Sequence, residues 1–308
     1  MITELNKDII KVVFFLLILT FLYYILPLAG LLIYIIWPIP VVYMTLKYDF
    51  REALITIILA AIINAFFIGF VIDMTAGIFM GMYTIIGFGL IGFLLGAGLK
   101  ENFSPLKTLV LTITGVFISN TIITFITPYL LDYSYQEIFA EISRSFEQNQ
   151  MLSEYSYLVE QQLAFLRIIF PSIMIISAVI IGSLIYYITI KYINKRGFNK
   201  NSFKPVRYWF FPRILSVLIA LILFANSLFF ETNVSANKIF INVIFVLLFF
   251  VFLQGFAVGL YYLSNIKSSL VTVIYITFII FFNFIALPGL IILGLIDMWF
   301  NIRKHSSD

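Results

Sequence analysis

The feature that most constrains this chain is a succession of apolar runs that are long enough, at about 20 residues each, to cross the ~30 Å hydrocarbon core of a bilayer as helices. Of the 308 residues, 62% are hydrophobic and only 11% are charged. A soluble domain carries about 25% charged residues, so this chain cannot hide its apolar surface in one aqueous core. The sequence therefore predicts an all-α, polytopic bundle of transmembrane helices.

The apolar runs predict about ten membrane spans. These cover residues 9–26, 28–46, 53–72, 76–99, 105–131, 168–190, 208–230, 239–263, 270–286 and 288–300. The second span contains Pro38 and Pro40, which remove backbone donors and are expected to kink it. The last apolar run is too long for one helix, and Pro288-Gly289 is expected to divide it.

The distribution of lysine and arginine predicts the orientation of the spans. Residues 191–213 hold seven basic and no acidic residues, so this loop is expected in the cytoplasm. Both chain ends then also lie in the cytoplasm of a cell-membrane protein, and the acidic segment 132–164 lies outside. We expect a six-span bundle over residues 1–191 and a second part, residues 192–308, with the basic loop and four further spans.

Small residues four apart predict close helix packing, because such residues share one face of a helix and let a neighbouring backbone approach. They are densest between Ala60 and Gly98, where two spans are joined by a turn near Asp73. The expected helix-packing residues are Ala61, Ala65, Gly77, Gly81, Gly92, Gly96, Gly255 and Gly259.

Polar residues within the spans are the places where chemistry is expected, because they are costly in lipid. They are Asn64, Asn120, Asn226, Asn242, Gln254, Asn283 and Asp297. We predict Asn64, Asn120 and Tyr83 as weak candidates for substrate binding, and an interhelical hydrogen bond is the alternative role for each Asn. Asp297 lies six residues before Arg303, at the inner end of the last span, where an interfacial position would explain it.

The sequence lacks the motifs of the common catalytic and cofactor sites. It has no cysteine, one histidine, no phosphate-binding loop and no nucleophile elbow. We therefore expect no enzyme activity, catalytic residue, metal or cofactor. The basic loop is explained by membrane orientation, so we expect the lipid bilayer, and no nucleic acid, as a partner.

The acidic segment 132–164 has apolar residues at helical spacing. Ile138, Ile142, Phe146, Leu152 and Val159 predict amphipathic helix on the outer face of the bundle. Such a segment would either rest on lipid headgroups or form a mobile lid over a cavity.

Three stretches carry a resemblance to known families: Pro38-Ile39-Pro40 leading to Leu46-Lys47-Tyr48, Gly96-Ala97-Gly98-Leu99-Lys100, and the C-terminal residues 293–304. Through them the chain resembles the YybS-like bacterial membrane proteins, a family of unknown function. The first six spans also look like the S component of energy-coupling factor transporters. That resemblance implies substrate capture, with an Ala-x-x-x-Ala face, matched by Ala61 and Ala65, docking on a coupling subunit driven by ATPases.

Two classes of function therefore stand open. The first is a substrate-capture subunit of a small-molecule transporter, which would need a separate ATP-driven partner because this chain has no nucleotide site. The second is a membrane scaffold or regulator that acts through helix packing. A cavity with a copurifying ligand would favour the first, and a fully packed interior would favour the second.

Overall fold

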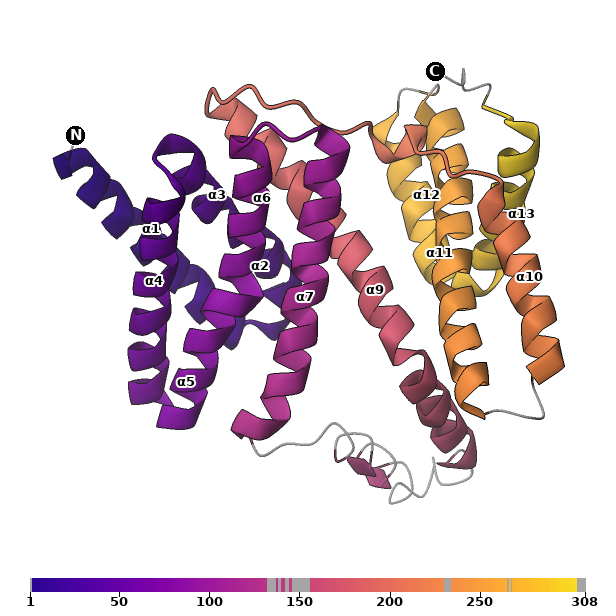
Figure 1. Cartoon of the computed structure of the whole chain (residues 1–308), viewed down its shortest axis with the longest axis horizontal. Helices are drawn as coiled ribbons and strands as arrows, with labels where there is room; N and C mark the ends of the chain where they lie inside the picture. Colours follow the sequence, from indigo (N-terminus) through magenta and orange to yellow (C-terminus); the bar gives the residue numbers. More distant parts are fainter. Residues whose placement is uncertain are drawn as a thin grey trace. The chain divides into compact units, whose positions relative to one another are not determined.

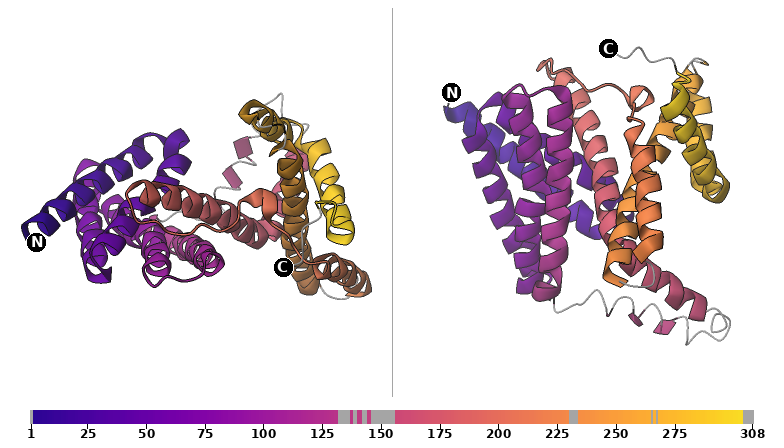
Figure 2. Two further views of the ribbon diagram at one scale, coloured as in Figure 1. Left: turned by 90° about the horizontal axis from the view of Figure 1, so that it is seen from above. Right: turned by 45° about the vertical axis from the view of Figure 1, so that its right-hand side comes forward.

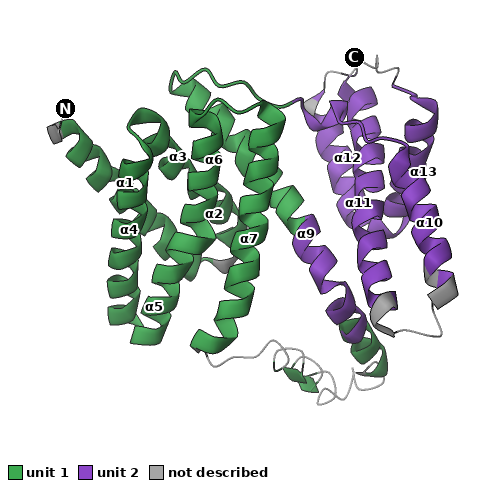
Figure 3. Cartoon of the chain, viewed as in Figure 1, with its two compact units in different colours: residues 1–163, 177–203 green, residues 164–176, 204–308 purple. Residues whose placement is uncertain are grey.

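The computed structural model describes residues 2–131, 156–229, 234–264 and 268–303, together with residues 137, 140, 141, 144, 145 and 266. Within these residues the fold consists of helices and turns, without a strand, which confirms the predicted all-α class (Figure 1). The helices form two compact units, one of residues 1–163 and 177–203 and one of residues 164–176 and 204–308 (Figure 3). The long helix α9 contributes to both units.

The first unit holds the helices of the N-terminal half. They are α1 (Ile2–Ile25), α2 (Gly30–Ile36), α3 (Pro38–Lys47), α4 (Phe50–Val71), α5 (Met74–Tyr83), a π-helix (Thr84–Gly89), α6 (Leu90–Lys100), α7 (Pro105–Leu131) and both ends of α9 (Ser156–Lys195), with a 3₁₀ turn at Pro27–Ala29. Helices α4 to α7 run side by side, as the second view of Figure 2 shows.

The second unit contains the C-terminal helices and the middle of α9. They are α10 (Ile214–Phe229), α11 (Val234–Ser264), α12 (Ser269–Phe281) and α13 (Asn283–Phe300), preceded by a 3₁₀ turn at Val206–Tyr208. Helix α11 packs along α13 and also contacts α10 and α12.

Eight described helices are long and apolar enough to cross a membrane, which confirms a multi-pass protein. The seventh and ninth predicted spans are shorter helices, Ile214–Ala225 and Leu270–Phe281. Helix α10 starts late because Pro212 disfavours helix at the preceding residue, and the Phe211 N–H is bound instead by the side chain of Gln254. The 13 residues of α12 reach only about 20 Å.

Of the two helix breaks predicted at prolines, the one at Pro38 lies next to its proline and the one at Pro288 does not. The chain turns at Trp37, and Pro38 occupies the first position of α3, where its missing N–H costs no helical bond. Pro288 lies inside α13, whereas the final apolar run divides at Phe282. There the Asn283 side chain donates a hydrogen bond of 3.2 Å to the Ile280 carbonyl and so caps the end of α12.

The sixth predicted span is longer than expected, since α9 begins at Ser156 and includes the end of the acidic segment. Val159 is half-buried on this helix. Ile138, Ile142, Phe146 and Leu152, on which the predicted amphipathic lid depends, lie outside the described residues.

Polar contacts gather several loops of the first unit at one end. Lys47 pairs with Asp8 of α1, and Lys200 donates to Asn102 after α6. Lys100 donates to the Tyr48 carbonyl and lies 3.2 Å from the Asp49 carboxylate. The Phe50 N–H, and then Lys100, lower the pKa of the Asp49 carboxyl below its usual value.

In the second unit, Arg303 donates hydrogen bonds to the carbonyls of Arg207 and Trp209. The chain that follows α13 thus lies at the same end as the loop before α10. These contacts fit the predicted orientation, in which both segments are cytoplasmic.

Labelling of single cysteines should test that orientation, because the native chain has none. In intact cells, a membrane-impermeant maleimide is expected to label Ser145→Cys but not Asn201→Cys or His305→Cys. All three should react after permeabilisation. Labelling of position 201 from outside would invert the assignment, and labelling of 305 alone from outside would contradict the shared end of Arg303 and Arg207.

Candidate functional site

The π-helix Thr84–Gly89 interrupts the helical span Met74–Lys100 near its middle. A π-helix has wider turns than an α-helix and is frequent at functional sites. It turns Phe88 inward, where the side chain is fully buried. The neighbouring Gly89 allows close packing, because a Cβ there would lie 2.6 Å from Cγ2 of Ile57.

Phe88 is the centre of an aromatic cluster. Its ring centroid lies 4.7 Å from that of Trp37 and 4.9 Å from that of Tyr83. The rings of Tyr23 and Tyr34 each lie 5.5 Å away. These separations are typical of aromatic pairs that interact favourably. The cluster joins α1, α2, the α2–α3 turn, α5 and the π-helix.

A pocket of about 540 Å³ opens beside this cluster within the first unit. It is lined by Tyr23, Tyr24, Gly30, Leu31, Tyr34, Tyr83, Asn120 and Ile181. Its volume is within the range of small-molecule sites, about 300–1,000 Å³. Among the described residues no charged side chain lines it, so its polar groups are phenols and one amide.

Hydrogen bonds fix those polar groups in place. The Tyr34 hydroxyl donates to Oδ1 of Asn120 at 3.0 Å, and the hydroxyls of Tyr23 and Tyr83 lie 3.1 Å apart. A ligand could compete for these bonds or add to them, since a hydroxyl both donates and accepts. Two of the three predicted substrate contacts, Tyr83 and Asn120, thus lie at one pocket.

Asn64, the third predicted contact, lies away from the pocket lining. Its amide is buried and donates to the hydroxyls of Thr20 at 3.1 Å and Thr84 at 3.0 Å. The indole of Trp37 donates to the same Thr20 oxygen at 3.0 Å. Asn64 therefore holds α1 and the start of the π-helix together, as in the alternative role of an interhelical hydrogen bond.

Five aromatic residues of this site were not predicted from the sequence: Tyr23, Tyr24, Tyr34, Trp37 and Phe88. Aromatic residues make up 18% of the chain, so these residues could not be distinguished in the sequence from other apolar or interfacial residues. The one local signal was Gly87-Phe88-Gly89, in which two glycines flank a large ring within a predicted span.

The predicted packing residues all lie against neighbouring helices. A Cβ on Gly77 would collide with the Ala65 carbonyl, and one on Gly81 would lie 2.9 Å from the Ala65 methyl group. Gly92 and Gly96 of α6 face α3 at Val41 and Thr45. In the second unit Gly255 faces α13, and Gly259 faces Tyr275 of α12. Ala61 is buried on the face of α4 that contacts α5.

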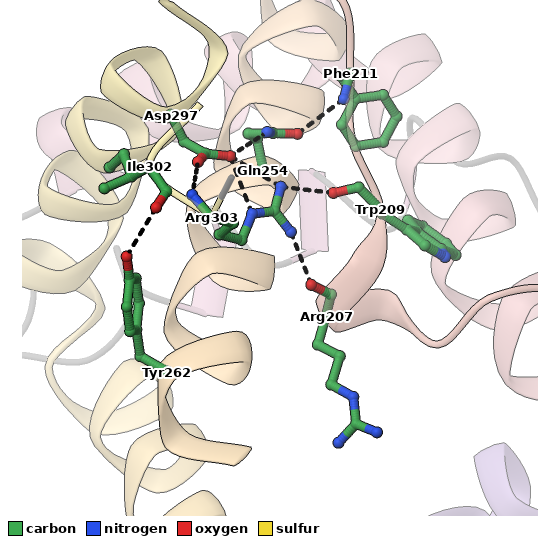
Figure 4. A network of polar contacts seen from close by, with 8 residues as sticks. All are labelled: Arg207, Trp209, Phe211, Gln254, Tyr262, Asp297, Ile302 and Arg303. Carbon is green, nitrogen blue, oxygen red and sulfur yellow. Dashed lines mark hydrogen bonds and ion pairs between the residues drawn. The ribbon is translucent and has the colours of Figure 1, made fainter. Parts of the chain in front are cut away.

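The second unit contains a buried ion pair at the end of α13 (Figure 4). Neither side chain of Asp297 and Arg303 is exposed, and Nη2 of Arg303 lies 2.9 Å from Oδ2 of Asp297. Asn301 adopts a left-handed conformation with φ of 46°, which ends α13 and turns the chain back. Gln254 donates to the same carboxylate, and its carbonyl oxygen accepts the Phe211 N–H at 2.9 Å.

Two other predicted polar residues of the second unit have packing roles. Asn242 of α11 accepts bonds from the Ser172 N–H and hydroxyl of α9 and donates to the Ile168 carbonyl. Asn283 caps α12, as described above. The side chain of Asn226 lies outside the described residues. Within the described part of the chain, no group of His, Cys, Asp or Glu residues is placed to hold a metal ion.

Comparison with known proteins gives one match. Residues 12–298 match a family described as predicted membrane protein (DUF2232). No curated protein and no solved structure matches the chain. Because the matched region covers nearly all of the sequence, and the fold is a bundle of apolar helices, the chain belongs to the DUF2232 family of predicted membrane proteins.

Proposed function

We propose that this protein captures a small molecule in the aromatic pocket of its first unit, as the substrate-binding subunit of a membrane transporter. The observation that carries the proposal is the pocket of about 540 Å³ beside the π-helix, with the Tyr34–Asn120 and Tyr23–Tyr83 pairs at its wall. The resemblance of the first six spans to S components supports the same role.

The lining favours one kind of substrate. Aromatic faces bind flat rings by stacking and cations by their quadrupoles, and phenol and amide groups bind polar edges. A carboxylate or phosphate would meet no cationic side chain among the described lining residues. We therefore propose an uncharged or weakly cationic molecule with a planar, hydrogen-bonding group.

Transport against a gradient would need an ATP-driven partner, since the sequence has no phosphate-binding loop. The Ala61/Ala65 face, expected from the S-component resemblance to contact a coupling subunit, is covered by α5 within this chain. We therefore propose that such a coupling subunit binds a different face of this protein.

Substitution of the pocket residues should remove a copurifying ligand. Asn120→Leu and Tyr83→Phe each delete a polar group at the wall, and each is expected to lower ligand occupancy about tenfold, the effect of losing one well-placed hydrogen bond to a buried ligand. Small molecules released from the detergent-purified protein would be measured by mass spectrometry.

The matched control is Tyr129→Phe, the same chemical change at a tyrosine of α7 that is 85% exposed. It should retain the ligand, and all variants should keep the wild-type melting temperature within a few degrees. If wild-type protein releases nothing beyond lipid, capture is contradicted and the alternative of a scaffold that acts through helix packing is favoured.

A further inference from the structure

A second cavity, of about 500 Å³, lies in the second unit, at the end where Arg303 donates to the carbonyls of Arg207 and Trp209. Arg207 reaches it from the 3₁₀ turn Val206–Tyr208, Ser264 from the end of α11, and Ser268 and Thr272 from the start of α12. Apolar residues, among them Val206 and Leu260, complete the lining. One guanidinium and several hydroxyls thus surround a cavity with an apolar wall.

The side chain of Arg207 is the central feature of this cavity. The backbone carbonyl of Arg207 accepts a hydrogen bond from Arg303, whereas the Arg207 guanidinium points away from Arg303 and Asp297 (Figure 4). Nε of Arg207 is buried without a hydrogen-bond partner among the described residues, and the guanidinium carbon lies 4.9 Å from the ring centroid of Tyr208. Within the described part of the chain, no carboxylate forms an ion pair with it.

A buried donor without a partner is costly, which favours a bound group that the protein itself does not supply. Arg303, which donates to the backbone carbonyl of Arg207, shows the contrast, because Asp297 and two carbonyls satisfy its guanidinium. Arginine presents its donors as a planar fork that suits the oxygens of phosphate.

Further donors come from the start of α12. Ser268 is the N-cap residue of this helix, yet its side chain makes no capping hydrogen bond. Thr272 follows four residues later, on the same face of the helix. The positive end of the α12 dipole points to the same region. Ser264 differs, since its hydroxyl donates to the Tyr261 carbonyl and offers the cavity only its oxygen.

We propose that this cavity binds a phosphate group, held by Arg207 and by the hydroxyls of Ser268 and Thr272. The group comes either from an anionic phospholipid or from a soluble phosphate ester. Part of the cavity lining, residues 205–207, belongs to the basic loop 191–213, which the sequence predicts at the cytoplasmic surface, where anionic headgroups are concentrated. This inference is independent of the aromatic pocket in the first unit.

The test compares Arg207→Gln with Arg213→Gln, which removes the same charge from an exposed position of the same loop outside the cavity. Binding of phosphatidylglycerol and of phosphatidylcholine to the detergent-purified full chain would be measured by native mass spectrometry. Binding of glycerol 3-phosphate would be measured by calorimetry in a second arm. Thr272→Val serves as a milder variant that keeps side-chain shape and the arginine.

Arg207→Gln should weaken phosphatidylglycerol binding by roughly tenfold or more, as expected for the loss of a charge-assisted hydrogen bond, while Arg213→Gln changes it less than about threefold. Thr272→Val should weaken it by a smaller factor. Phosphatidylcholine, whose phosphate charge is balanced by its own choline cation, should bind the wild type less tightly than phosphatidylglycerol does, and Arg207→Gln should reduce this preference. A selective loss of glycerol 3-phosphate binding, with lipid binding unchanged, would assign the site to a soluble ester.

The proposal is overturned if Arg207→Gln and Thr272→Val bind phosphatidylglycerol and glycerol 3-phosphate as tightly as the Arg213→Gln variant does. It is equally overturned if the wild-type protein binds phosphatidylglycerol no more tightly than phosphatidylcholine, a phospholipid without net charge, and binds no glycerol 3-phosphate. Because Thr272→Val leaves the loop and its arginine intact, a folding defect of Arg207→Gln would not prevent either decision.

Discussion

Alanine at Gly255 or Gly294 should unfold the second unit at a much lower temperature than the wild type, whereas alanine at Gly289 should not. Helices α11 and α13 touch through their backbones at the first two positions. A Cβ on Gly255 would overlap the Leu290 carbonyl and lie 3.0 Å from the Gly294 nitrogen, and one on Gly294 would overlap the Val251 carbonyl. Neither obstacle is a flexible side chain, so the helices must separate.

We expect each of these substitutions to cost about 3 kcal/mol, at the upper end of the usual penalty for overpacking. Thermal unfolding in detergent, followed by size-exclusion chromatography of the surviving protein, would measure the loss. Gly289 of α13 is the matched control, since nothing lies within 4 Å of a Cβ placed there. Gly289→Ala should be neutral or slightly stabilising. Equal melting temperatures for the three variants would show that the helices do not meet at Gly255 and Gly294.

Arg303→Met should destabilise the second unit by about 3–5 kcal/mol, because it leaves the Asp297 carboxylate buried without its counter-charge. The same change removes the donors for the Arg207 and Trp209 carbonyls, each held at 2.7 Å. The loop before α10 should therefore become accessible to protease at a lower temperature than in the wild type. Limited proteolysis at increasing temperature, with thermal unfolding in parallel, would measure both effects.

The double variant Asp297→Leu/Arg303→Met removes both charges and should recover part of the lost stability, since the main penalty of the single change is an unpaired ion. Lys47→Met, which breaks the partly exposed pair with Asp8 in the first unit, provides the control. It should cost less than about 1 kcal/mol. If Arg303→Met is as stable as Lys47→Met, Arg303 does not hold the second unit together.

The sequence predicted the features that depend on local spacing. Residues four apart share a helix face whatever the neighbouring helix is, so Gly77, Gly81 and Gly255 could be identified as contact positions without knowing their partners. Apolar run length predicted the long spans equally well. The break in the final apolar run was harder, because a transmembrane helix can tolerate an internal proline, as α13 does at Pro288, and the residue type alone does not show where such a helix ends.

The candidate site depends on contacts that local spacing does not reveal. Tyr23 and Tyr83 are 60 residues apart, and Tyr34 and Asn120 are 86 apart. Only the packing of α1, α2, α5 and α7 brings them to one pocket. Asp297 and Arg303, six residues apart, do not share a helix face. The left-handed turn at Asn301 joins them, and its conformation is not evident from the residue type alone.

The hydrogen bonds from Arg303 to the loop before α10 also impose an order on biosynthesis. The bond from Arg303 to the Arg207 carbonyl spans 96 residues of chain. A ribosome that adds about 5–20 residues per second needs roughly 5 to 20 seconds to make that length. During this interval α10 and the loop before it have been made, but the guanidinium that holds the loop carbonyls does not yet exist. The second unit must therefore complete its packing late, and until then the loop before α10 lacks the two hydrogen bonds that hold its carbonyls in the folded protein.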